Sequence, residues 1–132
     1  MNEIMVKYHN PDLTRITSYD KGDWIDLRSA EEVHMKAGEF KLISLGISIK
    51  IPEMFEMWLA PRSSTFKKFG IIQTNSIGII DNSYCGNNDV IKMPVYAVRD
   101  TVIDGKEIQV KYEHARICYD KTLQKLKKGA WQ

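Results

Sequence analysis

Short stretches in which apolar and polar residues alternate recur along the chain, and this pattern predicts β-strands with one buried face. The clearest is residues 47–51, where three isoleucines alternate with Ser48 and Lys50 before Pro52 ends the run. Residues 40–43 belong to the same strand or to the one before it. Further strands are expected at residues 57–59, 71–72, 77–80, 90–98 and 108–110, with Pro94 marking an edge or a bulge. Strands this short and numerous favour an all-β sandwich or barrel.

Two stretches are expected to be helical instead. Residues 63–69 begin with hydroxyl residues suited to capping a helix and end at Gly70, which allows at most about two turns. Residues 120–128 place Leu123 and Leu126 on one side and several lysines elsewhere, which predicts a weakly amphipathic, basic C-terminal helix. The basic face of that helix is most simply a solvated surface.

The composition is that of one ordinary globular domain, residues 1–132, with 43% hydrophobic and 27% charged residues. A net charge of +2 gives no strong electrostatic case for nucleic acid as a partner. No apolar run of membrane-spanning length and no signal-peptide core occur in this sequence, so we expect a soluble protein without a membrane partner. Cys85 and Cys118 have no metal-ligand spacing and fit a reducing compartment, so we expect a cytoplasmic protein.

The most informative run for chemistry extends from Gly78 to Gly86, where a β-branched strand ends in Asp81 and Tyr84 follows three residues later. A carboxylate, an aromatic hydroxyl and accessible backbone groups could together hold a nucleoside and activate a water molecule. The alternative is an ordinary hairpin turn, in which Asp81 and Asn82 bond their own backbone.

Two other runs carry candidate binding groups. Arg62, Ser63 and Ser64 precede the predicted short helix and could bind a phosphate, although a capped helix with a surface arginine is the simpler interpretation. Asp26, between two apolar strand residues, could hold a hydrated divalent cation or an arginine, or could face solvent. The three histidines are scattered, and no serine elbow or phosphate loop is present.

Taken together, these runs resemble the trimeric dUTPase family in order and spacing. The stretch WIDLRSA is similar to the family's first motif, APRSSTFKKFGI to the second, and NSIGIIDNSYCGNND to the third, with Asp-x-x-Tyr-x-Gly intact. The resemblance covers residues 19–101 and implies a β jelly roll that assembles as a homotrimer, with active sites between subunits. It also implies hydrolysis of dUTP to dUMP and pyrophosphate with Mg²⁺.

The resemblance assigns roles residue by residue. Asp81 would be the general base for a water that attacks the α-phosphorus, and Tyr84 would lie under the deoxyribose and exclude a 2′-hydroxyl. Asn75 and the backbone of residues 77–80, including Gly78, Ile79 and Ile80, would read uracil. Arg62, Ser63 and Ser64 would hold the phosphates from a neighbouring subunit. Asp26 would anchor the magnesium–triphosphate complex through water.

The chain departs from the family pattern at its C-terminal end. Arg116 is a candidate phosphate ligand in a late match to the fourth motif, where Tyr119 stands in place of the usual Gln. The glycine-rich arm of the fifth motif is missing, and the chain ends in a segment with Gly129 and Trp131. These departures leave open a lower rate, or a nucleotide-binding regulatory protein of the same fold. A dCTP deaminase is the less favoured alternative, because a matching glutamate base is not apparent.

Overall fold

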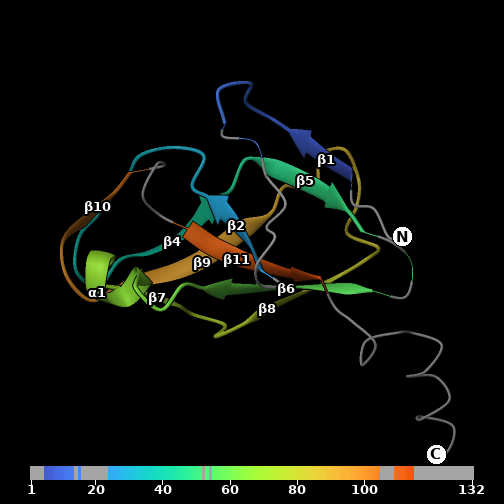
Figure 1. Cartoon of the computed structure of the whole chain (residues 1–132). Coiled ribbons are helices and arrows are strands. Elements are labelled where there is room, and N and C mark those ends of the chain that lie inside the picture. Colours follow the sequence, from blue (N-terminus) through green and yellow to red (C-terminus); the bar gives the residue numbers. More distant parts are fainter. Residues whose placement is uncertain are drawn as a thin grey trace, which may run out of the picture.

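The computed structural model describes residues 5–13, 15, 24–51, 53, 55–104 and 109–114, and for residues 24–25 and 109–114 it describes the backbone only. This part of the chain is built almost entirely of β-strands (Figure 1). The strands are β1 (Met5–Tyr8), β2 (Trp24–Arg28), β3 (Val33–Met35), β4 (Phe40–Ser44), β5 (Ile47–Lys50), β6 (Glu56–Pro61), β7 (Ile71–Gln73), β8 (Gly78–Asp81), β9 (Lys92–Ala97), β10 (Thr101–Ile103) and β11 (Gln109–His114).

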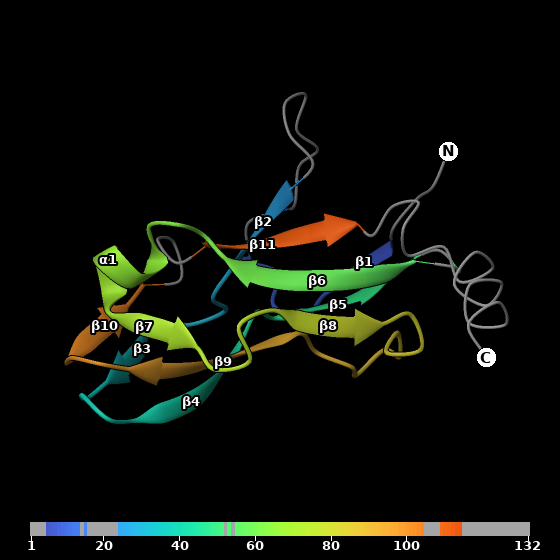
Figure 2. The same ribbon diagram turned by 90° about the horizontal axis from the view of Figure 1, so that it is seen from below.

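The strands form antiparallel sheets, of which the two largest position the candidate site. One has the order β2-β11-β6-β8 and the other the order β4-β9-β7 (Figure 2). Two smaller pairs, β1 with β5 and β10 with β3, complete the described part. The register places Asp81 opposite Glu56 and Gly78 opposite Leu59, so β8 runs along β6 at the edge of the larger sheet. The all-β architecture expected from the alternating pattern is confirmed.

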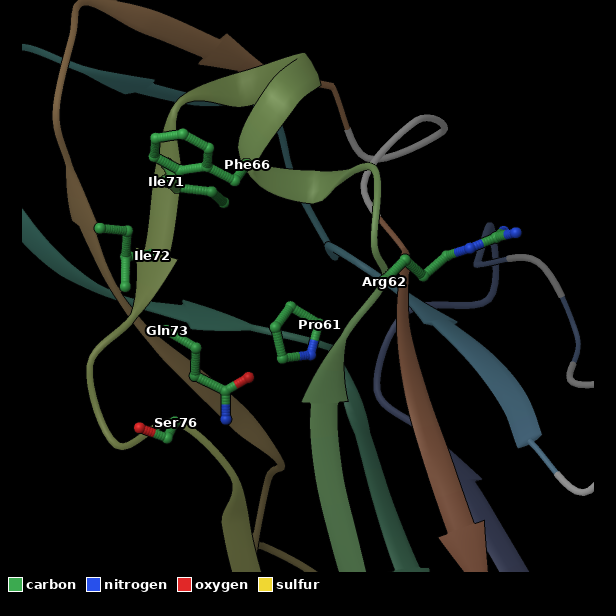
Figure 3. Close-up of a pocket in the computed structure, with 7 residues that line it drawn as sticks. All are labelled: Pro61, Arg62, Phe66, Ile71, Ile72, Gln73 and Ser76. Atoms are coloured by element: carbon green, nitrogen blue, oxygen red, sulfur yellow. The ribbon is translucent and has the colours of Figure 1, made fainter.

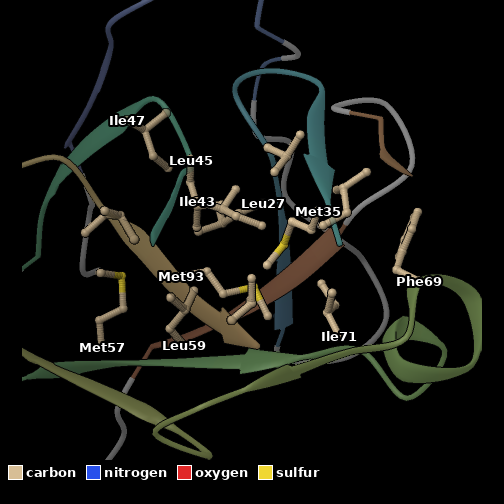
Figure 4. Close-up of a cluster of buried hydrophobic side chains, with 14 of the residues drawn as sticks. Leu27, Met35, Ile43, Leu45, Ile47, Met57, Leu59, Phe69, Ile71 and Met93 are labelled. Atoms are coloured by element: carbon tan, nitrogen blue, oxygen red, sulfur yellow. The ribbon is translucent and has the colours of Figure 1, made fainter. Parts of the chain in front are cut away.

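The hydrophobic core lies between the two larger sheets (Figure 4). Alternation along the strands builds it: β6 buries Met57 and Leu59, and β9 buries Met93, Val95 and Ala97 completely. Burying one aliphatic side chain of this size stabilises the fold by about 1.5–3 kcal/mol. Buried residues from nine different elements and their connections meet in this one cluster, which therefore fixes how the sheets lie against each other.

Helix α1 (Thr65–Phe69) is shorter than expected and begins differently. Ser64 occupies the cap position but its hydroxyl makes no capping hydrogen bond, so the expectation of a hydroxyl-capped start is wrong. The predicted end is confirmed, because Gly70 adopts the left-handed conformation with φ of 64°. Arg99 closes this end by donating from Nη2 to the carbonyls of Lys67 (2.9 Å) and Lys68 (3.0 Å).

Pro94 was expected at an edge or a bulge, yet β9 is the central strand of its sheet. The Pro94 carbonyl accepts a hydrogen bond from the Thr74 N–H at 3.0 Å, just beyond Gln73, the last ladder residue of β7. The nitrogen and carbonyl of one strand residue point to the same side. The missing N–H of Pro94 therefore faces Thr74, beyond the last ladder pair of β7, so only the bond that would complete this end pair is absent.

Three strands, β1, β3 and β10, each three or four residues long, were not anticipated from the sequence. The predicted C-terminal helix at residues 120–128 lies outside the described residues, as do Cys118 and Trp131. Among the described residues, no helix combines the length and apolar character needed to cross a membrane.

Candidate functional site

A pocket of about 430 Å³ lies along the end of β8. Two consecutive stretches of the chain form its walls: the end of β8 with the turn after it, and the segment that leads into β9. Within the described sheet β8 is an edge strand, so one side of its backbone is not used in ladder pairing with β6. The pocket is lined by Ile79, Ile80, Asp81, Ser83, Tyr84 and residues 90–92.

Asp81 stands at the rim of this pocket as the last residue of β8, and it is exposed. Its Oδ2 accepts a hydrogen bond from the Ser83 N–H at 3.2 Å, and its carbonyl accepts one from the Tyr84 N–H at 3.0 Å. The turn expected from the sequence and the candidate site are thus the same structure, because Asp81 both accepts the turn's hydrogen bonds and lines the pocket.

Tyr84 is fixed at the other side of the pocket although 41% of it is exposed. Its hydroxyl donates to the Val90 carbonyl at 3.0 Å, which ties the turn after β8 to the segment before β9. The loop between them is closed by the Gly86 N–H, which donates to Asp89 Oδ2 at 2.9 Å. An aromatic ring held in this way, next to a carboxylate, suits the binding of a flat, polar ligand.

Asn75 lies in the turn that enters β8, and the structure adds a neighbour that the sequence did not single out. Gln73 is 4% exposed, and its Nε2 donates to the Leu59 carbonyl (2.9 Å) and to Asn75 Oδ1 (2.8 Å). Gly78 makes room for this arrangement, because a Cβ there would lie 3.3 Å from Asn75 Nδ2. A glutamine in a short strand with isoleucine neighbours carries no local signal of such a role.

Arg62 and Asp26, two predicted binding residues 36 positions apart, contact each other. Arg62 Nη1 donates to Asp26 Oδ2 at 3.1 Å, and the two side chains are 39% and 18% exposed. Of the options open for Asp26, the structure therefore realises the arginine partner. Ser63 and Ser64 are exposed in the turn between Arg62 and α1. A helix of five residues adds little dipole, so this group would bind an anion through Arg62 and the hydroxyls.

A second pocket, also of about 430 Å³, adjoins Arg62 (Figure 3). Its walls are mostly apolar and come from the end of β6, from α1 and from β7. It is lined by Pro61, Arg62, Phe66, Ile71, Ile72, Gln73 and Ser76. It connects the Arg62 end of β6 with the outer face of the β4-β9-β7 sheet, to which Ile72 belongs.

The two groups of candidate residues lie at opposite ends of β6. Asp81 is opposite Glu56 at the beginning of this strand, and Arg62 directly follows Pro61 at its end. Six residues of extended chain separate these ends by about 20 Å. An arginine side chain cannot bridge that length, so one chain does not bring its own Arg62 to its own Asp81.

Arg116 and Tyr119 lie outside the described residues. Within the residues that the structure describes, no group of three or more His, Cys, Asp or Glu side chains is arranged to hold a metal ion. The carboxylate nearest to the anion-binding residues is Asp26, which Arg62 contacts. Such a donor set does not form a protein cage for a cation, but it suits a hydrated ion that a ligand brings with it.

Comparisons with known proteins point to one family. The sequence model of the dUTPase family matches residues 11–118. A prophage-derived (SPbeta) deoxyuridine 5′-triphosphate nucleotidohydrolase of Bacillus subtilis is 47% identical over 124 residues, covering 94% of this chain and 82% of that protein. The deoxyuridine 5′-triphosphate nucleotidohydrolase of Rickettsia bellii is 33% identical, covering 84% and 78%. A mutant dUTPase from phage phi11 of S. aureus, described with a structural Mg(II) ion, has the same fold, with a TM-score of 0.76, 16% identity and coverage of 88% and 92%.

Proposed function

The chain belongs to the dUTPase family, and we propose that it hydrolyses dUTP to dUMP and pyrophosphate. The observation that carries the proposal is the pocket along the free edge of β8, with Asp81 and Tyr84 at its rim, in a chain 47% identical to a named dUTP nucleotidohydrolase. Those relatives favour hydrolysis over a purely regulatory nucleotide-binding role and over deamination of dCTP.

The base and the sugar bind at the β8 pocket. Uracil is read by Asn75 and by the backbone of Gly78, Ile79 and Ile80, and Tyr84 lies under the deoxyribose. The accessible edge of β8 supports this assignment, because its unused N–H and C=O groups can bond the edge of a flat base much as another strand would.

Asp81 acts as the general base. It takes a proton from a water molecule, whose oxygen forms a bond to the α-phosphorus as the bond to the bridging oxygen of pyrophosphate breaks. The hydrogen bond from the Ser83 N–H to Asp81 Oδ2 restricts the carboxylate and so helps to aim it at the water. Proton transfer to a positioned carboxylate contributes about a hundredfold to ten-thousandfold in rate.

The phosphates bind to Arg62, Ser63 and Ser64 of another copy of the chain, and Arg116 remains a candidate for the same role. The separation of about 20 Å between the two ends of β6 supports a site shared between copies. We propose a homotrimer, in which three head-to-tail contacts close a ring and each forms one complete site.

The outer face of the β4-β9-β7 sheet is the surface proposed to receive the neighbouring copy. The register lines up Phe40, Tyr96 and Ile72 across the three strands, with Leu42 beside Pro94 in the next row. Phe40, Tyr96, Ile72 and Leu42 are all exposed large hydrophobic residues. A contiguous apolar face of this kind is typical of an interface. The pocket next to Arg62 joins this face through Ile72, so a copy bound here would lie beside Arg62.

Magnesium is the proposed cofactor, and the described residues fit an ion that the triphosphate carries. Asp26, half-enclosed and held by Arg62, would contact it through water. Bound there, the ion would neutralise phosphate charge. For the location in the cell, the cytoplasm remains our expectation from the cysteine content.

Measuring pyrophosphate release from dUTP, and separately from dTTP, dCTP and UTP as alternative substrates, tests the function directly. We expect turnover of dUTP alone and loss of turnover in Asp81→Asn, with the assembly unchanged by light scattering. Asp89→Asn is the matched control, because it changes a nearby carboxylate outside the pocket and should retain activity. Turnover by Asp81→Asn at the wild-type rate would show that the assignment of the base is wrong. Absence of dUTP turnover in the wild-type chain would contradict the function itself.

A further inference from the structure

The side-chain amide of Gln73 is held in one orientation by the backbone carbonyl that it faces. The Leu59 carbonyl can only accept a hydrogen bond, so the side of the Gln73 amide that faces it must be the NH₂ group. The side chain reaches from β7 toward β6, where Leu59 lies (Figure 3). Gln73 is 4% exposed, and its amide has no room to exchange its two ends freely.

This orientation passes on to Asn75. The second N–H of the Gln73 amide donates to Asn75 Oδ1 at 2.8 Å, so Asn75 must present its oxygen to Gln73. Its NH₂ group then faces away from Gln73 and lies against Gly78 at the start of β8. The backbone carbonyl of Leu59 thus determines, through two amides, that Asn75 presents a donor and not an acceptor beside Gly78, at the start of β8.

This orientation is unfavourable for the Gln73 side-chain oxygen. Gln73 Oε1 is buried and has no hydrogen-bond partner among the described residues. A buried acceptor without a partner destabilises the fold by about 1–3 kcal/mol. The two bonds from Nε2 hold the amide in place despite that cost.

We propose that Gln73 is a positioning residue that selects uracil over cytosine through Asn75. This inference rests on the proposed function, in which Asn75 contacts the base. Uracil carries a carbonyl oxygen at position 4, and cytosine carries an amino group there. A fixed NH₂ donor of Asn75 matches the carbonyl and opposes the amino group. A freely rotating asparagine would turn its oxygen to the amino group and accept cytosine as well.

Binding of dUMP and dCMP, measured by calorimetry, tests the proposal without relying on turnover. We expect the wild-type preference for dUMP to fall about tenfold in Gln73→Leu, which removes both amide bonds but keeps the site apolar and filled. Thr74→Val, in the same turn but outside these bonds, is the matched control and should keep the preference. The ratio of kcat/KM for dUTP and dCTP should change in parallel.

A double-mutant cycle separates positioning from a general loss of structure. In an Asn75→Ala background, Gln73→Leu should change the preference by less than about twofold, because its route to the base is gone. If the effect persists in that background, or if a folded Gln73→Leu keeps the wild-type preference, the proposal is overturned.

An exposed substitution covers the case in which Gln73→Leu does not fold. Asn75→Asp places an acceptor where the NH₂ group stood and should shift the preference toward dCMP; an unchanged preference would overturn the proposal. A wild-type chain that binds and distinguishes the two nucleotides but does not hydrolyse dUTP would contradict the proposed function and leave the inference standing. A chain that binds neither would overturn both.

Discussion

The two ends of strand β6 carry the two halves of the proposed site, and they are built in different ways. At the Asp81 end, the hydrogen bonds are local: Ser83 to Asp81, Tyr84 to Val90, and Gly86 to Asp89 span two to six residues. At the Arg62 end, a half-exposed ion pair with Asp26 joins positions 36 residues apart. The Asp81 end, which we call the base end because the nucleobase is proposed to bind there, can therefore be shaped by one chain. The Arg62 end, which we call the phosphate end, depends on how distant parts of the chain, and in our proposal different chains, come together.

Mixing two inactive variants tests most directly whether the two ends of one site come from different chains. Asp81→Asn removes the function of one end and Arg62→Ala that of the other, so each variant alone should be nearly inactive. If sites form between copies, co-expressed 1:1 mixtures should regain activity in roughly a quarter of their sites, those that join an intact Asp81 to an intact Arg62. Pyrophosphate release from the mixture measures this, and mixtures of one variant with itself are the control. A mixture with no more activity than its components would place both ends in one chain.

Separating the copies should inactivate the protein while leaving each end intact. Leu42→Glu puts a charge in the apolar face formed by Phe40, Leu42, Ile72 and Tyr96, and burying it unpaired in an interface is strongly unfavourable. We expect a monomer by light scattering and a loss of activity of about a hundredfold or more. Val102→Glu, which changes an exposed valine on β10, is the matched control. A trimer in the Leu42→Glu variant would move the interface to another surface.

The phosphate end should also be sensitive to the residue that orients Arg62. Asp26→Asn keeps an acceptor for Arg62 Nη1 but removes the negative charge, so Arg62 is held more weakly. We expect kcat/KM for dUTP to fall about tenfold, with a higher Mg²⁺ concentration needed for half-maximal rate. Titration of Mg²⁺ at fixed dUTP measures this. An unchanged titration would remove Asp26 from the magnesium assignment.

Sequence patterns predict those parts of this molecule that depend on interactions between residues close together in the chain. The alternation of β6 and the isoleucines of β5 predicted these buried side chains correctly, but Ser48 between the isoleucines is buried as well, against the expectation of a half-buried strand. Gly70 ended the helix because only glycine takes its φ of 64° without strain. Asp81 and Tyr84 lie at the same pocket because a turn with only two residues between them joins them. Gln73 could not be recognised in this way, because its partner Leu59 is on another strand. Pro94 was misjudged for the same reason: its place in a central strand depends on where β7 ends.

The Asp81 end of β6, where we propose that the nucleobase binds, should be the less sensitive of the two ends to the loss of one hydrogen bond. The variant Tyr84→Phe tests this. The variant keeps the ring that the proposal puts under the deoxyribose and removes only the hydroxyl that donates to Val90. We expect KM for dUTP to rise about threefold, with kcat nearly unchanged, and the free energy of unfolding to fall by about 0.5–1.5 kcal/mol in urea titrations. Tyr84→Ala, which removes the ring as well, should raise KM much further. Since neighbouring bonds from Ser83 and Gly86 still hold the turn, a large drop in kcat on removal of the hydroxyl alone would mean that the base end is not self-contained. The contrast between the two ends of β6 would then disappear.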